Sequence, residues 1–233
     1  MMKHWHAILA LWLAVVLPAG AAGAERAPVL VELFTSDVSA SSQPAELLLG
    51  QLDATAVVLN EHVSSLDSRS LRDRFASEGS TKRHQAYGDR FRLEGILVPL
   101  IVVNGGAQFL GSDPKRASDD IAKAAKRVKI VPRLSWVDRG VQIGIDGAHV
   151  GDRVYLALAD DSVAAGESRG KPLVQVAVCR EIRAAGVVPL GGAFYELVEL
   201  PPQARKQRAI VWIQVGEVGA VAGAAMLPPA DSQ

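Results

Sequence analysis

In the first half of the chain, short apolar runs alternate with amphipathic stretches that have helical spacing. Apolar and β-branched runs predict strands at residues 28–34, 56–63, 100–103 and 107–110. Helical spacing predicts helices at residues 44–52, 71–93 and 115–129, with the second divided in two near residue 79. Asn104-Gly105 is a strong hairpin signal between the last two strands. This order of elements predicts an α/β domain.

After Pro132 the pattern changes, because no run with helical period follows. Short apolar or alternating runs predict strands at residues 134–138, 141–145, 153–159, 173–182, 194–200 and 209–215. Such strands, separated by turn residues, are typical of an antiparallel sheet or sandwich. We therefore expect two domains after the N-terminal segment, an α/β domain over residues 25–131 and a β-rich antiparallel domain over residues 132–233.

The first 24 residues have the pattern of a cleaved signal peptide. Lys3 precedes an apolar run at residues 7–17, and Ala22-Gly23-Ala24 offers a small-residue cleavage site before Glu25. The run is shorter than the roughly 20 residues that a membrane-spanning helix needs. We expect an exported protein, periplasmic or secreted, that has no stable membrane insertion once residues 1–24 are removed.

The charge balance excludes some partners. Loss of Lys3 lowers Lys+Arg from 25 to 24 against 25 Asp+Glu, so the mature net charge is near −1. A near-neutral chain without a basic run has no electrostatic reason to bind nucleic acid. Cys179 is the one cysteine, so no intramolecular disulfide can form even in an oxidising compartment. We predict that Cys179 is buried, because its neighbours form an apolar strand.

Three segments together resemble a secreted, thioredoxin-like bacterial family of unknown function. They are Val31 to Ser36 (VELFTS), His62 to Tyr87, and Val98-Pro99 to Gly105, and the resemblance continues through the second half. It implies a thioredoxin-like fold for residues 25–131. It also implies a cis Val98-Pro99 bond beside the redox loop, a geometry that few X-Pro bonds adopt.

The same resemblance places Ser39 and Ser42 where typical members carry a Cys-x-x-Cys motif. A serine hydroxyl can neither form a disulfide nor supply the thiolate that dithiol exchange requires. His62 would lie beside this degenerate loop with Val98 and Pro99. These five residues form the candidate ligand site, and no catalytic residue, metal ligand or cofactor is predicted.

Two rival motifs carry less weight. Gly166 to Gly170 (GESRG) matches the G-x-S-x-G nucleophile elbow, but a β-branched run follows it where a helix is required, so we interpret it as a hairpin. His62, His84 and His149 are the histidines of the mature chain, and their spacing is not that of metal ligands. Asp67 and Asp73 are interpreted as capping or solvent-facing residues.

The sequence favours an exported binding or accessory protein that lacks dithiol redox activity. Its partner would be a protein or a small ligand, and the 39–42 loop could bind an anion or peptide through hydroxyls and helix N–H groups. One alternative is an enzyme that uses non-thiol groups at Ser39, Ser42 and His62. Another is a redox protein that acts through Cys179 with a partner thiol.

Overall fold

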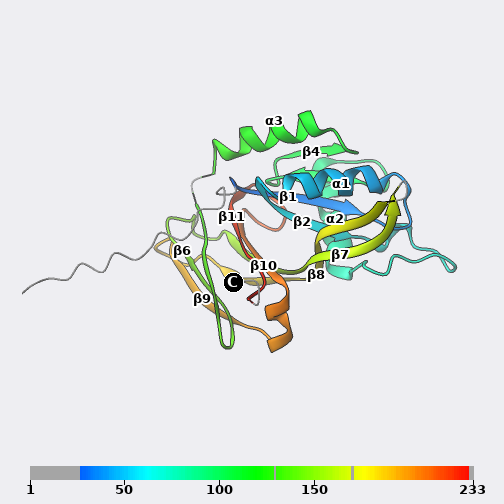
Figure 1. Cartoon of the computed structure of the whole chain (residues 1–233). Coiled ribbons are helices and arrows are strands. Elements are labelled where there is room, and N and C mark those ends of the chain that lie inside the picture. The colour runs from blue at the N-terminus through cyan, green and yellow to red at the C-terminus, as the bar shows by residue number, and fades with distance from the viewer. Residues whose placement is uncertain (1–26, 129, 169–170, 231–233) are drawn as a thin grey trace, which may run out of the picture.

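The computed structural model describes residues 27–128, 130–168 and 171–230 (Figure 1). The expected signal segment, residues 1–24, lies outside the described residues. The elements of the first half are β1 (Ala27–Thr35), α1 (Ser42–Leu52), β2 (Ala56–His62), the 3-10 turn η1 (Ser64–Leu66), α2 (Glu78–Phe91), β3 (Leu100–Val103), β4 (Ala107–Leu110) and α3 (Pro114–Ala125).

The second half is made of strands and one short 3-10 turn. They are β5 (Arg133–Val137), β6 (Gly140–Ile145), β7 (Arg153–Ser168), β8 (Lys171–Val187), β9 (Phe194–Glu199), η2 (Pro202–Lys206), β10 (Arg208–Gln214) and β11 (Val221–Leu227). No α-helix is present among the described residues after α3.

One large sheet runs through both halves of the chain. Its eight strands have the order β11-β10-β7-β8-β2-β1-β3-β4, and β5-β6-β9 form a separate three-stranded sheet. Strand β8 joins β2 in parallel, with Asn60 opposite Val178. The expected fold class is therefore wrong: the molecule is mostly β, with a mixed sheet in place of a thioredoxin-like α/β domain followed by a separate β-rich domain.

The reason for this error is a pairing between distant segments. Strands β7 and β8 are 16 and 17 residues long, so their antiparallel pair extends past the second half and reaches the first. Figure 1 shows this pair running beside β2 toward α1, and β8 contacts α1 as well as β2. Local patterns predict strands but not their partners, and the sheet crosses the boundary expected at residue 131.

Several local expectations are confirmed and two are wrong. The hairpin at Asn104-Gly105 connects β3 to β4, and both residues have positive φ. Residues 71–93 hold one helix rather than two, because Ser77 accepts a hydrogen bond from the backbone N–H of Ser80 and starts α2 there. The sequence analysis missed β11, whose Ala- and Gly-rich sequence VAGAAML has weak strand propensity.

Two apolar layers stabilise the molecule. Helices α1 and α3 contribute Leu49 and Ile121 to a core that also holds Leu33 of β1 and Trp212 of β10. A second core lies between the large and small sheets, where Ile143 packs with residues of β7 and β10. Trp212, Leu33, Leu49 and Ile143 have no exposed surface, so burial of these layers is the main source of stability.

A buried ionic network connects α2 to both halves of the large sheet. The guanidinium of Arg83 in α2 pairs with Glu32 of β1, and its Nη2 donates to Gln214 of β10 at 2.9 Å. The Tyr87 hydroxyl donates to Glu32 at 2.7 Å and accepts a hydrogen bond from Gln214 at 3.0 Å. A paired and hydrogen-bonded charge can remain buried at a tolerable cost.

Glu61 of β2 lies at the edge of this network and is fully buried. Neither of its carboxyl oxygens has a hydrogen-bond partner among the described residues, and Arg83 Nε is 3.9 Å away. Burial and the negative charge of Glu32 raise the pKa of Glu61 well above 4.5, although Arg83 opposes this shift. The folded state therefore holds Glu61 as a neutral acid over a pH range in which the unfolded chain ionises it.

We expect Glu61→Gln to gain stability relative to the wild type as pH rises from about 4.5 toward neutrality. Because the pKa of Glu61 is raised in the folded state, its contribution to the free energy of unfolding is fully present below pH 4.5 and is lost as pH rises toward the folded pKa. Glutamine is neutral at every pH and loses nothing. The gain should approach ~1.4 kcal/mol per pH unit within that window. Urea unfolding at several pH values measures it.

The control for this experiment is Glu196→Gln, which changes an exposed carboxylate on β9. A constant offset between Glu61→Gln and the wild type could arise from altered hydrogen bonding. Parallel stability curves across the whole pH range would therefore contradict the buried neutral acid.

Candidate functional site

The candidate site lies where the parallel strands β1 and β2 end. Thr35 is the last residue of β1 and His62 the last of β2, and the two are register partners. Because partners in a parallel pair point to the same face, both side chains lie on one side of the sheet. The edge formed by the carboxyl ends of parallel strands is a frequent place for ligand sites.

The loop between β1 and α1 closes over this edge. Ser42, the first residue of α1, accepts a hydrogen bond on its Oγ from the backbone N–H of Ser36 at 3.3 Å, and only 2% of its surface is exposed. Two turns, from Ser39 N–H to Ser36 O and from Ser42 N–H to Ser39 O, fold the loop tightly.

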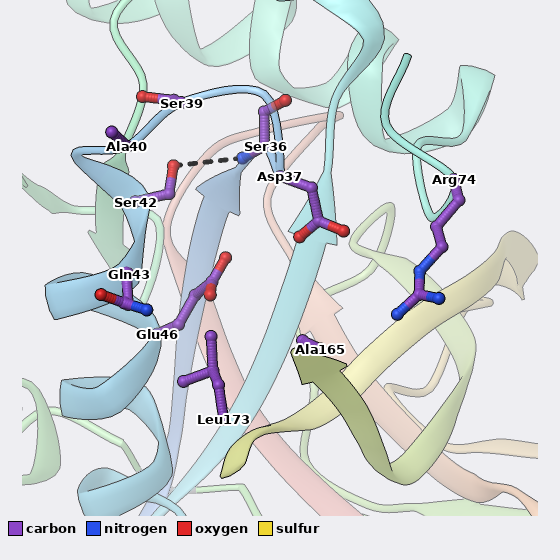
Figure 2. Close-up of a pocket in the computed structure, with 10 residues that line it drawn as sticks. All are labelled: Ser36, Asp37, Ser39, Ala40, Ser42, Gln43, Glu46, Arg74, Ala165 and Leu173. Atoms are coloured by element: carbon purple, nitrogen blue, oxygen red, sulfur yellow. Dashed lines mark hydrogen bonds between the residues drawn. The ribbon is translucent and has the colours of Figure 1, made fainter. Parts of the chain in front are cut away.

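A cavity of about 570 Å³ lies under this loop (Figure 2). Ser39, Ser42 and Glu46 line it from the loop and α1, Leu173 of β8 lies beside Glu46, and Arg74 lies across the space. Figure 2 shows the carboxylates of Asp37 and Glu46 pointing into the same space. The volume is that of a pocket for a small molecule.

His62 forms a dyad with Asp73 at the base of the site. Its Nδ1 lies 2.7 Å from Asp73 Oδ2, and neither side chain has any exposed surface. The ring also packs edge-on against Phe75, with 5.2 Å between the ring centroids. With Nδ1 held by a carboxylate, Nε2 is the free nitrogen, and it has no hydrogen-bond partner among the described residues.

Asp73 holds the adjacent chain as well as the histidine. Its carboxylate accepts hydrogen bonds from the backbone N–H groups of Asp37 and Phe75, each at 2.8 Å. Burial opposes ionisation, but the hydrogen bond to His62, the charge of His62 and these N–H donors together lower the pKa of Asp73 below 3.8. Asp73 therefore stays ionised and fixes the ring of His62.

The side chains of Asp37 and Glu46 lie near His62 of the dyad. Each of the three residues offers one ligand atom, and these three atoms lie within 4.8 Å of one another. Thr35 Oγ1 donates to Glu46 Oε1 at 2.8 Å, and Gln175 Nε2 of β8 donates to Asp37 Oδ1 at 3.1 Å. Elements far apart in the chain thus orient one acidic cluster.

Two further buried polar side chains accompany the cluster. The Oε1 atom of Gln175 and both amide atoms of Asn60 have no hydrogen-bond partner within the described ranges. Gln175 is fully buried and Asn60 is 1% exposed. Asn60 lies two residues before His62 on β2, so it shares the face of His62. Each buried polar group without a partner costs about 1–3 kcal/mol. Several such groups in one place are typical of a site that a bound ligand completes.

The structure places the five predicted site residues in different surroundings. Ser39 and Ser42 line the cavity, whereas His62 lies buried beneath it. The Val98-Pro99 bond is cis, which confirms that expectation. Neither Val98 nor Pro99 is among the residues that line the cavity.

Sequence reasoning missed four contributors, Asp37, Glu46, Asp73 and Gln175. Asp73 was interpreted as capping or solvent-facing, but its side chain is fully buried and pairs with His62. Asp67 Oδ1 accepts the backbone N–H of Asp73 at 3.0 Å, so it holds the loop before α2 rather than capping that helix, whose N-cap is Ser77. Glu46 gave one usable signal, since it lies on the apolar face of a helix that otherwise carries leucine and alanine.

The rival motif is a hairpin, as expected. Ser168, the serine of GESRG, is the last residue of β7, and β8 begins at Lys171. The turn residues 169–170 lie outside the described residues. A nucleophile elbow needs a helix after its serine, and a strand follows here.

Comparison with known proteins places the chain in a family. Residues 30–214 match the family model described as "Protein of unknown function (DUF1223)". The chain belongs to the DUF1223 family. No curated protein matches it.

The fold of this DUF1223 protein also occurs in a solved structure. An X-ray crystal structure of a protein from Agrobacterium tumefaciens matches it with a TM-score of 0.78 and 22% identity. The match covers 90% of this chain and 97% of the other. At this identity the likeness shows the fold alone. No described helix of the DUF1223 protein is both long and apolar enough to cross a membrane.

We expect Asp73→Ala to destabilise this DUF1223 protein by about 1–3 kcal/mol, because it leaves the buried ring of His62 and two backbone N–H groups without an acceptor. Because the pKa of Asp73 is lowered in the folded state, its contribution to the free energy of unfolding is fully present above pH 3.8. This contribution is lost as pH falls through the folded pKa. The difference in urea midpoint should therefore shrink in strong acid.

The matched control is Asp89→Ala, which removes an exposed aspartate of α2. It should change stability by less than about 0.5 kcal/mol. Equal effects of the two substitutions at neutral pH would contradict the role of Asp73.

Proposed function

We propose that this DUF1223 protein is an exported binding protein without dithiol redox activity, and that it binds a positively charged ligand in the cavity at the ends of β1 and β2. The observation that carries the proposal is the convergence of Asp37 and Glu46 on one space, beside buried polar atoms that have no partner among the described residues. Export remains a prediction from residues 1–24.

The charge of the cavity favours a cation. Asp37 and Glu46 contribute two carboxylates, and Arg74 is the one basic residue among those that line it. The guanidinium of Arg74 donates to Ala164 O at 2.9 Å and stacks over Phe75 at 4.4 Å, so it is engaged at the wall. Field lines of two carboxylates in a recess attract positive charge.

The same arrangement disfavours the anionic ligand considered for the 39–42 loop. The first turn of α1 carries no acidic residue of its own, but Glu46 lies one turn further and faces the cavity. Ser42 Oγ accepts a hydrogen bond from Ser36 N–H, and Ser39 Oγ lies 2.8 Å from Ser41 Oγ. An anion would therefore meet the negative charge of two carboxylates.

The non-thiol enzyme alternative lacks an assembled nucleophile. His62 and Asp73 form the base-and-orienter part of a triad, but no serine hydroxyl is hydrogen-bonded to His62 among the described residues. His62 also has no exposed surface, so a substrate in the cavity cannot contact it without rearrangement. A general base must reach the proton it removes.

The partner-thiol alternative fails on access and reactivity. Cys179 is 1% exposed. Its Sγ lies 3.7 Å from Glu181 O, and burial together with the charge of Glu61 raises the pKa of its thiol far above the usual value. The reactive species in thiol exchange is the thiolate, and this environment suppresses it.

We expect a thiol reagent such as DTNB to label Cys179 slowly in native protein and fast in denaturant. Burial blocks the reagent, so native labelling should follow the rate of unfolding. Absorbance of the released thiolate measures the reaction. Rapid native labelling, or a dimer that a reductant dissociates, would instead support the partner-thiol alternative.

We expect the chelator-treated mature chain to bind at least one positively charged probe from a panel of spermidine, tetralysine and Zn²⁺. Citrate and glutathione serve as anionic comparators that should not bind. Isothermal titration calorimetry measures binding. Ala40→Trp places an indole at the exposed rim of the cavity and should abolish binding of the organic probes.

Ala54→Trp is the control, because Ala54 is exposed in the turn at the other end of α1. It should bind the probes like the wild type. The proposal fails if no positively charged probe binds, or if the organic probes bind equally well to both tryptophan variants.

A further inference from the structure

Three side chains, two that line the cavity and His62 buried beneath it, are held in the way that proteins hold metal ligands. His62 Nδ1 is bound by Asp73, Glu46 Oε1 by Thr35, and Asp37 Oδ1 by Gln175. Each of these bonds fixes one atom of the candidate ligand and leaves another free. Metal sites commonly have such supporting hydrogen bonds, above all a carboxylate on the second nitrogen of a ligating histidine.

The free atoms are a nitrogen and carboxylate oxygens. His62 Nε2 has no hydrogen-bond partner among the described residues. In the same part of the chain, no residue donates to Asp37 Oδ2 or Glu46 Oε2. A cation shared by His62, Asp37 and Glu46 would give these unpartnered atoms a common partner.

Gln175 supplies an independent sign of a missing ligand. Its Nε2 is bound to Asp37, which places Oε1 next to the cluster, and this oxygen lacks a partner although the residue is fully buried. Buried amide oxygens are nearly always paired with a donor or a cation. A bound cation or its water would supply the partner that this oxygen lacks among the described residues.

We propose that Asp37, Glu46 and His62 bind one divalent first-row transition metal ion, with Gln175 Oε1 as a further ligand directly or through water. This inference rests on the proposed function, because it identifies the positive charge that the cavity accepts. The mixed donor set decides the class: imidazole favours zinc, iron, nickel or copper, whereas calcium and magnesium prefer oxygen ligands alone.

The geometry requires only small movements. Two ligands about 2.1 Å from one ion lie about 3.4 Å apart at a tetrahedral angle and about 4.2 Å apart when opposite. One ligand atom from each of the three residues, with either ring nitrogen counted for His62, already lies within 4.8 Å of the other two. Asp37 has 29% of its side chain exposed, which gives the ion a path from solvent.

The test uses the mature chain, residues 25–233, after treatment with EDTA and dialysis. Calorimetry with Zn²⁺, Mn²⁺, Mg²⁺ and Ca²⁺ measures stoichiometry and affinity, and Co²⁺ reports the ligand field by its visible absorption. We expect one Zn²⁺ or Co²⁺ per chain, with much weaker binding of Mg²⁺ and Ca²⁺. Failure of Zn²⁺ and Co²⁺ to bind at millimolar concentration would overturn the proposal.

Variants assign the ion to these residues. Glu46→Gln keeps the shape of the side chain and removes its charge, so it should weaken Zn²⁺ binding at least about 100-fold. Thr35→Val removes the supporting hydrogen bond and should weaken binding about 10–100-fold. Thermal unfolding of the metal-free variants checks that each is folded.

His149→Gln and Glu196→Gln are matched controls, because both residues are exposed and lie outside the cavity. Zn²⁺ affinity should be unchanged in both. Loss of binding in His149→Gln, or wild-type affinity in Glu46→Gln, would place the ion elsewhere and overturn the proposal. Affinities for Mg²⁺ or Ca²⁺ equal to that for Zn²⁺ would overturn the transition-metal class.

The failure of this inference is distinguishable from failure of the proposed function. If spermidine or tetralysine binds and Ala40→Trp blocks it while Zn²⁺ does not bind, the cavity is a cation site without a metal. If no positively charged probe binds, both proposals fail together.

Discussion

The structure depends on the buried guanidinium of Arg83, which joins its two halves. It pairs with Glu32 from the first half of the chain and donates to Gln214 from the second. Removing one partner of such a group would leave an uncompensated buried charge, at a cost of about 3–5 kcal/mol. Because its partners come from β1 and β10, α2 can dock only when both halves of the large sheet are in place.

This network contrasts with the polar cluster at the ends of β1 and β2. Around Arg83, the side chains of Glu32, Tyr87 and Gln214 find partners within the protein, and only Glu61 at the edge has none among the described residues. Around His62, buried atoms of His62, Gln175 and Asn60 find none among the described residues. Burial removes water from the polar groups of both clusters, and the difference lies in what replaces it. A network that is complete without a ligand stabilises the fold, whereas one that is incomplete indicates where a ligand belongs.

Local structure could be predicted from the sequence, but the fold could not. Strands such as β1 and β2 follow from β-branched runs, and the β3–β4 hairpin follows from Asn104-Gly105. The pairing of Asn60 with Val178 has no local signal, because a strand pattern is the same whichever neighbour it finds. That pairing merges the halves, and it also carries Gln175 to the site. The expectation of two domains and the failure to foresee the acidic cluster therefore have one cause.

The sequence predicted the serines of the site but not its acidic residues, again because the acidic residues meet only through contacts between distant segments. Ser39 and Ser42 were found because a resemblance pointed to their loop, and they do line the cavity. The residues with the strongest chemistry were overlooked because each has an ordinary role in its own segment: Glu46 is a polar residue in a leucine-rich helix, and Asp73 follows a charged stretch. Only the shared face of β1 and β2 brings Glu46 to Thr35 and Asp73 to His62. A loop without thiols therefore still covers an oriented set of nitrogen and oxygen donors, and a set of this kind can hold a ligand without dithiol chemistry.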